Sequence, residues 1–256
     1  MPPPPTTIIV LAKQPVPGRV KTRLCPPCSP SQAARIAEAA LVDTLDAALA
    51  ARADRVVLAL DGRPGDWCPA AVEVVGQGSG SLDERLTAAW AAAATGPAVL
   101  VGMDTPQIGA DELDGALDLV GRHGAVLGPA RDGGWWALGL RRPHPEAFAG
   151  VPMSRSDTGR RQRDRLEALG LRPALLATRT DVDTWAAALA VARAAPAGRF
   201  ALAVAAVARE VAAADVPDAP DAVDALTGSA AAARQAADPR RAGLFAAASG
   251  HAEQER

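Results

Sequence analysis

The chain has 256 residues, of which 49% are hydrophobic and 22% are charged, as is usual for a globular protein with one domain and an appendage or with two small domains. Its 27 lysines and arginines stand against 29 acidic residues, so no overall basic field directs it to nucleic acid or to an anionic membrane. The N-terminus has no charged segment followed by an apolar one, and no apolar run is long enough to cross a bilayer, which predicts a cytoplasmic protein without a membrane span.

The first predicted strand, residues 7–11, runs into a loop that concentrates positive charge before a helix predicted from Ser31 to Ala51. Prolines and Gly18 punctuate this loop. In an open α/β sheet, cations beside a glycine turn at the carboxyl end of the first strand are placed to hold a phosphorylated ligand. A solvated basic surface loop is the alternative. The basic residues are Lys13, Arg19, Lys21 and Arg23.

The three cysteines do not form an even set, which argues against a disulfide framework. Cys25 and Cys28 have the spacing of a redox pair, but such a pair needs its first cysteine at a helix N-terminus, and the helix is predicted to begin several residues later. Zinc would require further ligands, and neither Cys68 nor the three histidines show a paired metal spacing. Redox and zinc chemistry are therefore not expected.

The following segments alternate strands with helices, which indicates parallel pairing in an α/β sheet. Apolar runs at residues 55–60 and 71–75 predict two buried strands, and a Gly/Ser-rich loop leads from the second into a helix predicted from 82 to 95. Ser81 and Glu84 can form a capping box at the start of that helix. The glycines of the loop either let a nucleotide base approach the backbone or only provide a flexible turn.

Asp104 follows the most strand-like run of the chain, residues 96–102. A carboxylate at the end of a buried central strand lies where open α/β sheets bind ligands, and Mg²⁺ prefers hard oxygen ligands of this kind. A helix cap is the alternative. Asp104 lies too far upstream of the helix predicted from 111 to 122, however, and Gly109 or Asp111 is the better cap. A role toward a metal or ligand is therefore favoured for Asp104.

The segment Asp132-Gly133-Gly134 follows a strand predicted at residues 125–129. An Asp-Gly pair between apolar runs is typical of a hairpin turn. Alternatively, the two glycines bring backbone N–H groups close to a ligand, while Trp135 or its neighbour Trp136 walls a pocket.

Asp181 and Asp183 lie between a strand predicted at residues 171–177 and a helix predicted from 185 to 194. Asp183 or Thr184 can cap that helix. Alternating carboxylates of an extended segment also face the same way, so both aspartates could approach one cation. From the residues alone, the cap is the favoured interpretation.

Four motifs occur in a fixed order along residues 7–194. They are Ala12-Lys-x-Pro-x-Pro-Gly-x-Val-Lys-Thr-Arg-Leu24, Gly102-x-Asp-x-Pro106, Gly128-Pro-Ala-x-Asp-Gly-Gly134 and Asp181-Val-Asp-Thr184. Together they resemble the DUF2064 family of transferases, which is related to the MobA-like and 2-phospholactate guanylyltransferase (CofC-like) nucleotidyltransferases. The resemblance implies a three-layer α/β/α nucleotide-diphospho-sugar transferase fold of the glycosyltransferase-A (GT-A) type, with a mostly parallel central sheet.

The resemblance covers about residues 7–194, which predicts a transferase domain, residues 1–195, followed by an Ala-rich helical extension, residues 196–256. A helix is predicted from Phe200 to Ala214. Helices with so little bulk bury little surface, so the extension is expected to pack on the domain or on a second subunit of a homodimer, or to fray.

By resemblance, the first loop lies along the phosphates of a nucleotide, Asp104 carries the metal, Mg²⁺ or Mn²⁺, and Asp181 or Asp183 approaches that metal from the opposite side. The implied catalytic residues are Lys21, Arg23 and Asp104. The implied nucleotide-binding residues are Leu11, Ala12, Lys13, Gly18, Lys21, Arg23, Gln77, Gly78 and Arg85. The implied acceptor-binding residues are Asp132, Gly133, Gly134 and Trp135. The chain departs from the family pattern at the two cysteines of the first loop and at Ser81 with Asp83, where Asp-Leu-Gly is expected.

The leading hypothesis is a Mg²⁺-dependent nucleotidyltransferase, in which a small phosphorylated or similar acceptor attacks the α-phosphate of a nucleoside triphosphate and pyrophosphate leaves. A glycosyltransferase that uses a nucleotide-diphosphate sugar is the rival. Such enzymes typically carry Asp-x-Asp after the central strand, whereas Asp104-Thr105-Pro106 has no second carboxylate. A nucleotide-binding protein without turnover is the third hypothesis.

Overall fold

Seven strands, formed by the β-branched and aliphatic runs of the sequence, make one sheet in the order β3-β2-β1-β4-β6-β5-β7. The computed structural model describes residues 3–214. The strands are β1 (Thr7–Lys13), β2 (Arg55–Asp61), β3 (Glu73–Gly76), β4 (Ala98–Gly102), β5 (Ala125–Pro129), β6 (Trp135–Leu140) and β7 (Ala174–Leu175). Strands β3, β2, β1 and β4 are mutually parallel, and β6 runs antiparallel to both β4 and β5.

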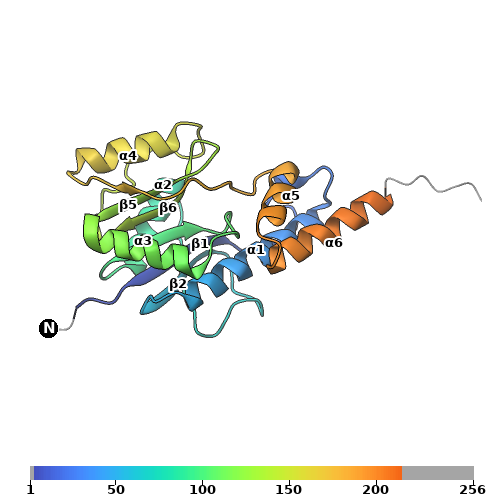
Figure 1. Cartoon of the computed structure of the whole chain (residues 1–256), viewed down its shortest axis with the longest axis horizontal. Coiled ribbons are helices and arrows are strands. Elements are labelled where there is room, and N and C mark those ends of the chain that lie inside the picture. Colours follow the sequence, from blue (N-terminus) through green and yellow to red (C-terminus); the bar gives the residue numbers. More distant parts are fainter. Residues whose placement is uncertain (1–2, 215–256) are drawn as a thin grey trace, which may run out of the picture. The chain divides into compact units, whose positions relative to one another are not determined.

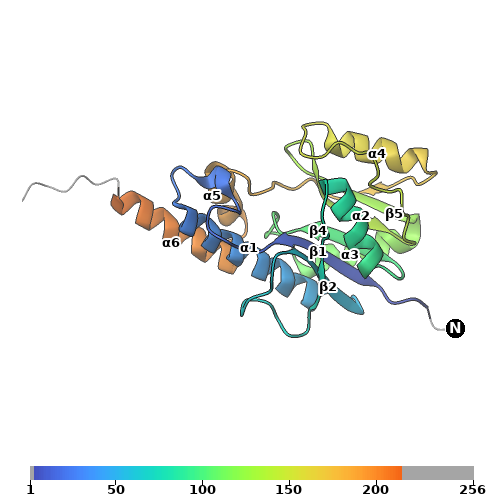
Figure 2. The same ribbon diagram turned by 180° about the vertical axis from the view of Figure 1, so that it is seen from behind.

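Helices cover both faces of this sheet (Figures 1 and 2). They are α1 (Pro30–Ala50), α2 (Leu82–Ala93), α3 (Ala110–His123), α4 (Thr158–Ala168), α5 (Trp185–Ala194) and α6 (Arg199–Ala214), with a 3₁₀ turn, η1, at Thr22–Leu24. In β1, Ile8 and Val10 are buried in the cluster that includes α1 and α3, whereas Ile9 is buried in the cluster that includes α2 and α4. The two clusters arise because successive side chains of a strand point to opposite faces. The predicted three-layer, mostly parallel fold is confirmed.

Most predicted elements differ from the observed ones by only a few residues at their ends, but the late strand is much shorter than predicted. The pattern at residues 171–177 predicts a full strand, and β7 comprises only Ala174–Leu175. It lies at the edge of the sheet and pairs only with β5, at Val126 and Leu127. An edge strand receives hydrogen bonds from one neighbour only, so a strand-like segment there need not become a long strand.

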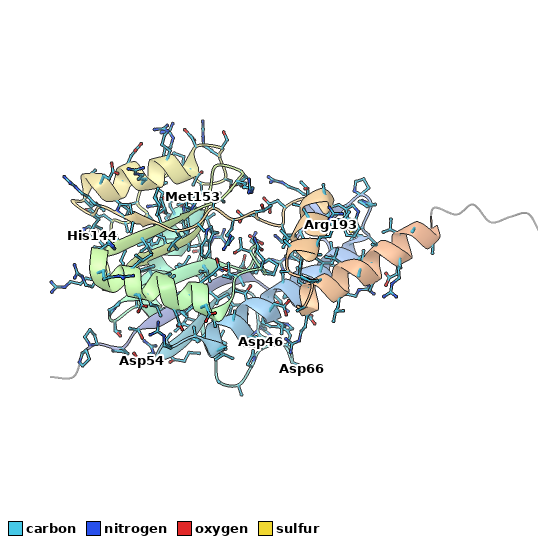
Figure 3. The ribbon with its side chains drawn as sticks, viewed as in Figure 1. Asp46, Asp54, Asp66, His144, Met153 and Arg193 are labelled. Atoms are coloured by element: carbon cyan, nitrogen blue, oxygen red, sulfur yellow. The ribbon has the colours of Figure 1, made fainter. Side chains whose placement is uncertain are left out.

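The last described helix, α6, packs against α1. Phe200 and Val204 are buried together with Ile36 in a third apolar cluster. The backbone N–H groups of Arg199 and Phe200 donate to the Asp43 carboxylate at 3.0 and 2.8 Å, which satisfies two of the otherwise unpaired donors at the start of α6. Figure 3 labels Asp46 on the same helix α1, and Asp46 pairs with Arg199. The predicted helix is thus confirmed, while the boundary predicted after residue 195 stays a prediction.

The rest of the predicted extension, residues 215–256, lies outside the described residues. Within residues 3–214, no helix has both the length and the apolar content that a membrane span needs.

Candidate active site

A cleft of about 470 Å³ opens at the carboxyl ends of β1 and β4. In an open α/β sheet, this is the edge at which ligands bind. The residues that line it are Leu11, Ala12, Lys13, Arg19, Val20, Lys21, Thr22, Arg23, Gln77, Leu82, Arg85, Met103, Asp104, Ser154 and Asp183.

Most residues predicted to bind the nucleotide line this cleft. They are Leu11, Ala12, Lys13, Lys21, Arg23, Gln77 and Arg85. Gly18 and Gly78 do not line it, and both have positive φ, +76° and +77°. These two glycines therefore shape the loops that carry the lining residues Arg19 and Gln77, because L side chains rarely adopt that conformation.

Lys21 is the most enclosed cation of the cleft, with only 5% of its side chain exposed. Its ammonium group forms an ion pair with Asp104, lies 3.6 Å from an oxygen of Asp183 and donates to the carbonyl of Val182 at 2.5 Å. The N–H of Val182 in turn donates to the carbonyl of Asp104 at 2.8 Å. Lys21 therefore bridges two segments that are distant in sequence and that both carry predicted metal ligands.

The helix after Asp183 is capped by Thr184, whose hydroxyl accepts from the N–H of Ala187 at 3.2 Å. The Asp183 carboxylate turns instead toward the cleft, where it lies 3.4 Å from the guanidinium of Arg23. The interpretation favoured from the residues alone is thus correct for Thr184 and wrong for Asp183. Because Thr184 provides the cap, the Asp183 carboxylate is not needed there and faces the cations of the cleft.

Asp181 is partly buried, and one of its carboxylate oxygens, Oδ1, is buried without a hydrogen-bond partner among the described residues. Burial is the largest cause that raises the pKa of Asp181 to about 7, and the nearby Asp132, Asp104 and Asp183 contribute to the rise, against the opposing effect of Lys21. An unpaired buried carboxylate oxygen among other carboxylates fits a divalent cation, which prefers hard oxygen ligands.

Within residues 3–214, no three Asp, Glu, His or Cys side chains are arranged so that they could already hold a metal ion. Lys21 lies between Asp104 and Asp183 instead. The choice of Asp104, Asp181 and Asp183 as ligands therefore stays a prediction, to which the structure adds Asp132 as a neighbour of Asp181. Sequence reasoning placed Asp132 with the acceptor only.

Gln77 is buried, and its side-chain amide forms hydrogen bonds within the protein. Its Nε2 donates to the carbonyls of Ala12 and Ala59, at 2.7 and 2.9 Å, and so ties the ends of β1 and β2 together. Its Oε1 accepts from the guanidinium of Arg85 at 3.2 Å, and Arg85 also lies 3.4 Å from Asp61. In this arrangement Gln77 positions Arg85 at the cleft, and its own donors are not free for a base.

A second, smaller pocket of about 200 Å³ adjoins the cleft. Asp104, Leu11, Leu82 and Ser154 line both cavities. The other lining residues are Leu86, Leu100, Gly102, Thr105, Asp132, Gly134, Trp135, Trp136, Met153, Arg155, Thr158 and Asp181. Asp104 thus stands where the two cavities meet.

Three of the four residues predicted to bind the acceptor, Asp132, Gly134 and Trp135, line this pocket. Gly133 does not line it. At its φ of +91°, an added Cβ would lie 1.8 Å from the carbonyl oxygen of Ser156, so Gly133 allows a close approach of the two backbones. The segment is also the predicted hairpin turn, because β5 and β6 are antiparallel neighbours.

The cysteine pair lies beside the basic loop. Cys28 is buried in the third apolar cluster, and burial, with a smaller contribution from Cys25, raises the pKa of the Cys28 thiol to about 11. A thiol with so high a pKa stays protonated near neutral pH and is a poor nucleophile.

Several residues at the cleft were not predicted individually from the sequence. Ser154 lines both cavities and has a positive φ of 57°, and Met103 and Leu82 form apolar parts of the wall. Apolar and hydroxyl side chains of this kind are common throughout a globular chain. They are recognised as lining residues only in the folded structure, where three separate segments lie close together.

The family model described as "Uncharacterized protein conserved in bacteria (DUF2064)" matches residues 35–155. The predicted resemblance to this family is confirmed over these residues, which include Asp104 and Asp132 but neither the basic loop nor Asp181 and Asp183. No curated protein matches the chain.

Solved structures extend the likeness over most of the chain. A protein named as a candidate nucleotide-diphospho-sugar transferase from Desulfovibrio desulfuricans G20 has 25% identity and a TM-score of 0.72, covering 81% of this chain and 95% of its own. This neighbour confirms the predicted fold and the predicted transferase class.

Two more distant structures represent both kinds of transfer. One is 2-C-methyl-D-erythritol 4-phosphate cytidylyltransferase from Thermus thermophilus, with 16% identity, a TM-score of 0.44 and coverage of 80% of this chain and 98% of its own. The other is glucosyl-3-phosphoglycerate synthase from Mycobacterium tuberculosis, in complex with Mn²⁺, uridine diphosphate and glucosyl-3-phosphoglycerate, with 14% identity, a TM-score of 0.43 and coverage of 69% and 70%. Likenesses at so low a TM-score say nothing specific about this chain.

Proposed function

We propose that this protein is a divalent-cation-dependent nucleotidyltransferase, which transfers a nucleoside monophosphate from a nucleoside triphosphate to an oxygen of a small acceptor and releases pyrophosphate. One observation carries the proposal: Lys21, from the basic loop, contacts Asp104 and lies close to Asp183 at a cleft that opens into a second pocket. Cations for phosphates and carboxylates for a metal thus meet where two substrates could meet.

Each cavity has its own part in the proposed reaction. The cleft holds the nucleotide, and Lys13, Lys21 and Arg23 offset the negative charge of its phosphates. Asp104, Asp181 and Asp183 would hold Mg²⁺ or Mn²⁺, which supplies charge neutralisation and orients the phosphate oxygens. The second pocket holds the acceptor, so that its oxygen reaches the α-phosphate beside Asp104. Positioning and charge neutralisation account for most of the acceleration in such a transfer, and no protein nucleophile is needed.

A glycosyltransferase is the second candidate, and the name of the Desulfovibrio neighbour favours it. Two features of this chain favour nucleotidyl transfer instead. Four basic residues of one loop line the cleft, Lys13, Arg19, Lys21 and Arg23, which suits a triphosphate. Only one carboxylate, that of Asp104, lies in the segment Asp104-Thr105-Pro106 after β4.

Phosphorus NMR of the products tests the proposal. The wild-type protein is incubated with Mg²⁺ and either nucleoside triphosphates or nucleotide-diphosphate sugars, together with a mixed panel of small acceptors. Release of pyrophosphate supports nucleotidyl transfer, release of a nucleoside diphosphate from a sugar nucleotide supports the second candidate, and nucleotide binding without any product supports a binding protein. Asp104→Asn, which keeps the shape of the side chain but removes its charge, is expected to lower turnover at least about a hundredfold. Undiminished turnover would reject the role of Asp104.

A further inference from the structure

The second pocket is mainly apolar, although it adjoins a strongly charged cleft. Leu86 and Leu100 are buried at its wall, and Trp135, Trp136 and Met153 complete the apolar lining. Trp135 is held in place by stacking on Phe148, with ring centroids 6.1 Å apart. A volume of about 200 Å³ is comparable to the cavity of about 150 Å³ that accepts one benzene molecule. The pocket therefore suits a compact body with few polar groups.

The charged groups of this pocket are mostly negative. Asp104, Asp132 and Asp181 line it, and the one cationic side chain among its described lining residues is that of Arg155. The Arg155 guanidinium is 63% exposed and lies 3.5 Å from the carboxylate of Asp157, so it is already paired and solvated. A phosphate monoester would therefore bring further negative charge beside three carboxylates, with a single exposed cation to offset it. A divalent cation would compensate the carboxylates, but its charge also has to neutralise the phosphates of the nucleotide.

A second observation indicates that the pocket receives a ligand with one polar end. Thr105 lines the pocket and is 1% exposed, and its hydroxyl has no hydrogen-bond partner among the described residues. Buried polar atoms are normally paired, so this hydroxyl, next to Asp104 in an apolar pocket, marks the place for the polar group of a ligand.

We propose that the acceptor is a small uncharged alcohol with an apolar body rather than a phosphorylated compound. This inference rests on the proposed function and narrows its acceptor. The hydroxyl oxygen of the alcohol forms a bond to the α-phosphorus of the nucleotide as the bond to the pyrophosphate oxygen breaks, and the hydroxyl proton passes to the Asp132 carboxylate. The products are a phosphodiester and pyrophosphate. The apolar body lies against Trp135, Leu86 and Leu100.

Binding of a matched pair of probes tests this inference without requiring turnover. Saturation-transfer NMR in a buffer containing Mg²⁺ compares benzyl alcohol with benzyl phosphate, which share the apolar body and differ only in the charged phosphate. The wild-type protein is expected to bind benzyl alcohol at least about tenfold more tightly, a difference of about 1.4 kcal/mol. Equal or tighter binding of benzyl phosphate would overturn the inference. Because the probes report binding alone, such a failure is distinct from a failure to release pyrophosphate.

A charge introduced at the wall of the pocket tests whether the two probes bind there. Met153, labelled in Figure 3, is half-buried in the segment that precedes α4 and lines the pocket. Met153→Lys is expected to weaken binding of benzyl alcohol and to strengthen binding of benzyl phosphate, so that the preference falls at least about tenfold. Leu202→Lys adds the same charge at a residue of α6 that is 68% exposed and should leave the preference unchanged. A preference that is the same in all three proteins would place the probe elsewhere and overturn the inference.

Discussion

Removing the ammonium group of Lys21 should make the protein bind a free divalent cation more tightly. In the structure that group lies between Asp104 and Asp183, the place that a metal ion would have to share. Lys21→Met keeps much of the length and apolar surface of the side chain but removes the charge. Without its ammonium group, the carboxylates lose a competing cation, and a metal ion no longer has to displace it before binding.

The size of the effect follows from the contacts that the ammonium group would lose. A hydrogen bond to a charged group contributes about 1.5–3 kcal/mol. The side chain of Lys21 is only 5% exposed and that of Asp104 is 47% exposed, so solvent screens their ion pair in part. Since about 1.4 kcal/mol corresponds to a tenfold change in affinity, Lys21→Met should bind Mn²⁺ about tenfold to a hundredfold more tightly than wild type.

Electron paramagnetic resonance of free Mn²⁺, titrated with protein in the absence of nucleotide, measures this affinity directly. Lys13→Met is the matched control, because Lys13 lines the same cleft but is exposed. It removes an equal charge and should change the Mn²⁺ affinity much less. If Lys21→Met binds Mn²⁺ no more tightly than wild type, or if both variants gain equally, Lys21 does not compete with the metal at these carboxylates and the reasoning is refuted.

Three further predictions concern local structure and are tested by chemical denaturation. Thr184→Ala removes the cap of α5 and should lower the free energy of unfolding by about 1 kcal/mol, whereas Thr184→Ser should largely retain it. Gly133→Ala should be more destabilising than Gly150→Ala, because both positions have positive φ but only Gly133 meets a backbone oxygen, that of Ser156; equal losses would contradict this. Asp43→Ala leaves two N–H groups of α6 unpaired and should cost about 1–3 kcal/mol, and a loss below about 0.5 kcal/mol would mean that this cap does not hold α6.

The sequence by itself predicted most of the strands and helices and the order in which they occur. Periods of two and 3.6 residues are local signals, so the strands and helices follow from short windows of sequence. For the same reason, Asp104 could be placed at the carboxyl end of a buried strand, because a strand and the residues just after it are close in the chain. The short edge strand β7 is the exception, since its length depends on the partner it pairs with.

The tertiary structure alone decided which side chains meet. Lys21 meets Asp104 because β1 lies beside β4 in the sheet. Val182, 161 positions away from Lys21 in the chain, joins them through the hydrogen bond from its N–H to the carbonyl of Asp104. Likewise, the sequence predicted that Gln77 binds the nucleotide, but only the fold shows that its amide donates to backbone carbonyls of β1 and β2. Contacts across a sheet depend on strand order, and no local pattern of hydrophobicity or charge encodes that order. The sequence therefore predicted which groups could do the chemistry, and the packing of distant strands determined which of them face one another.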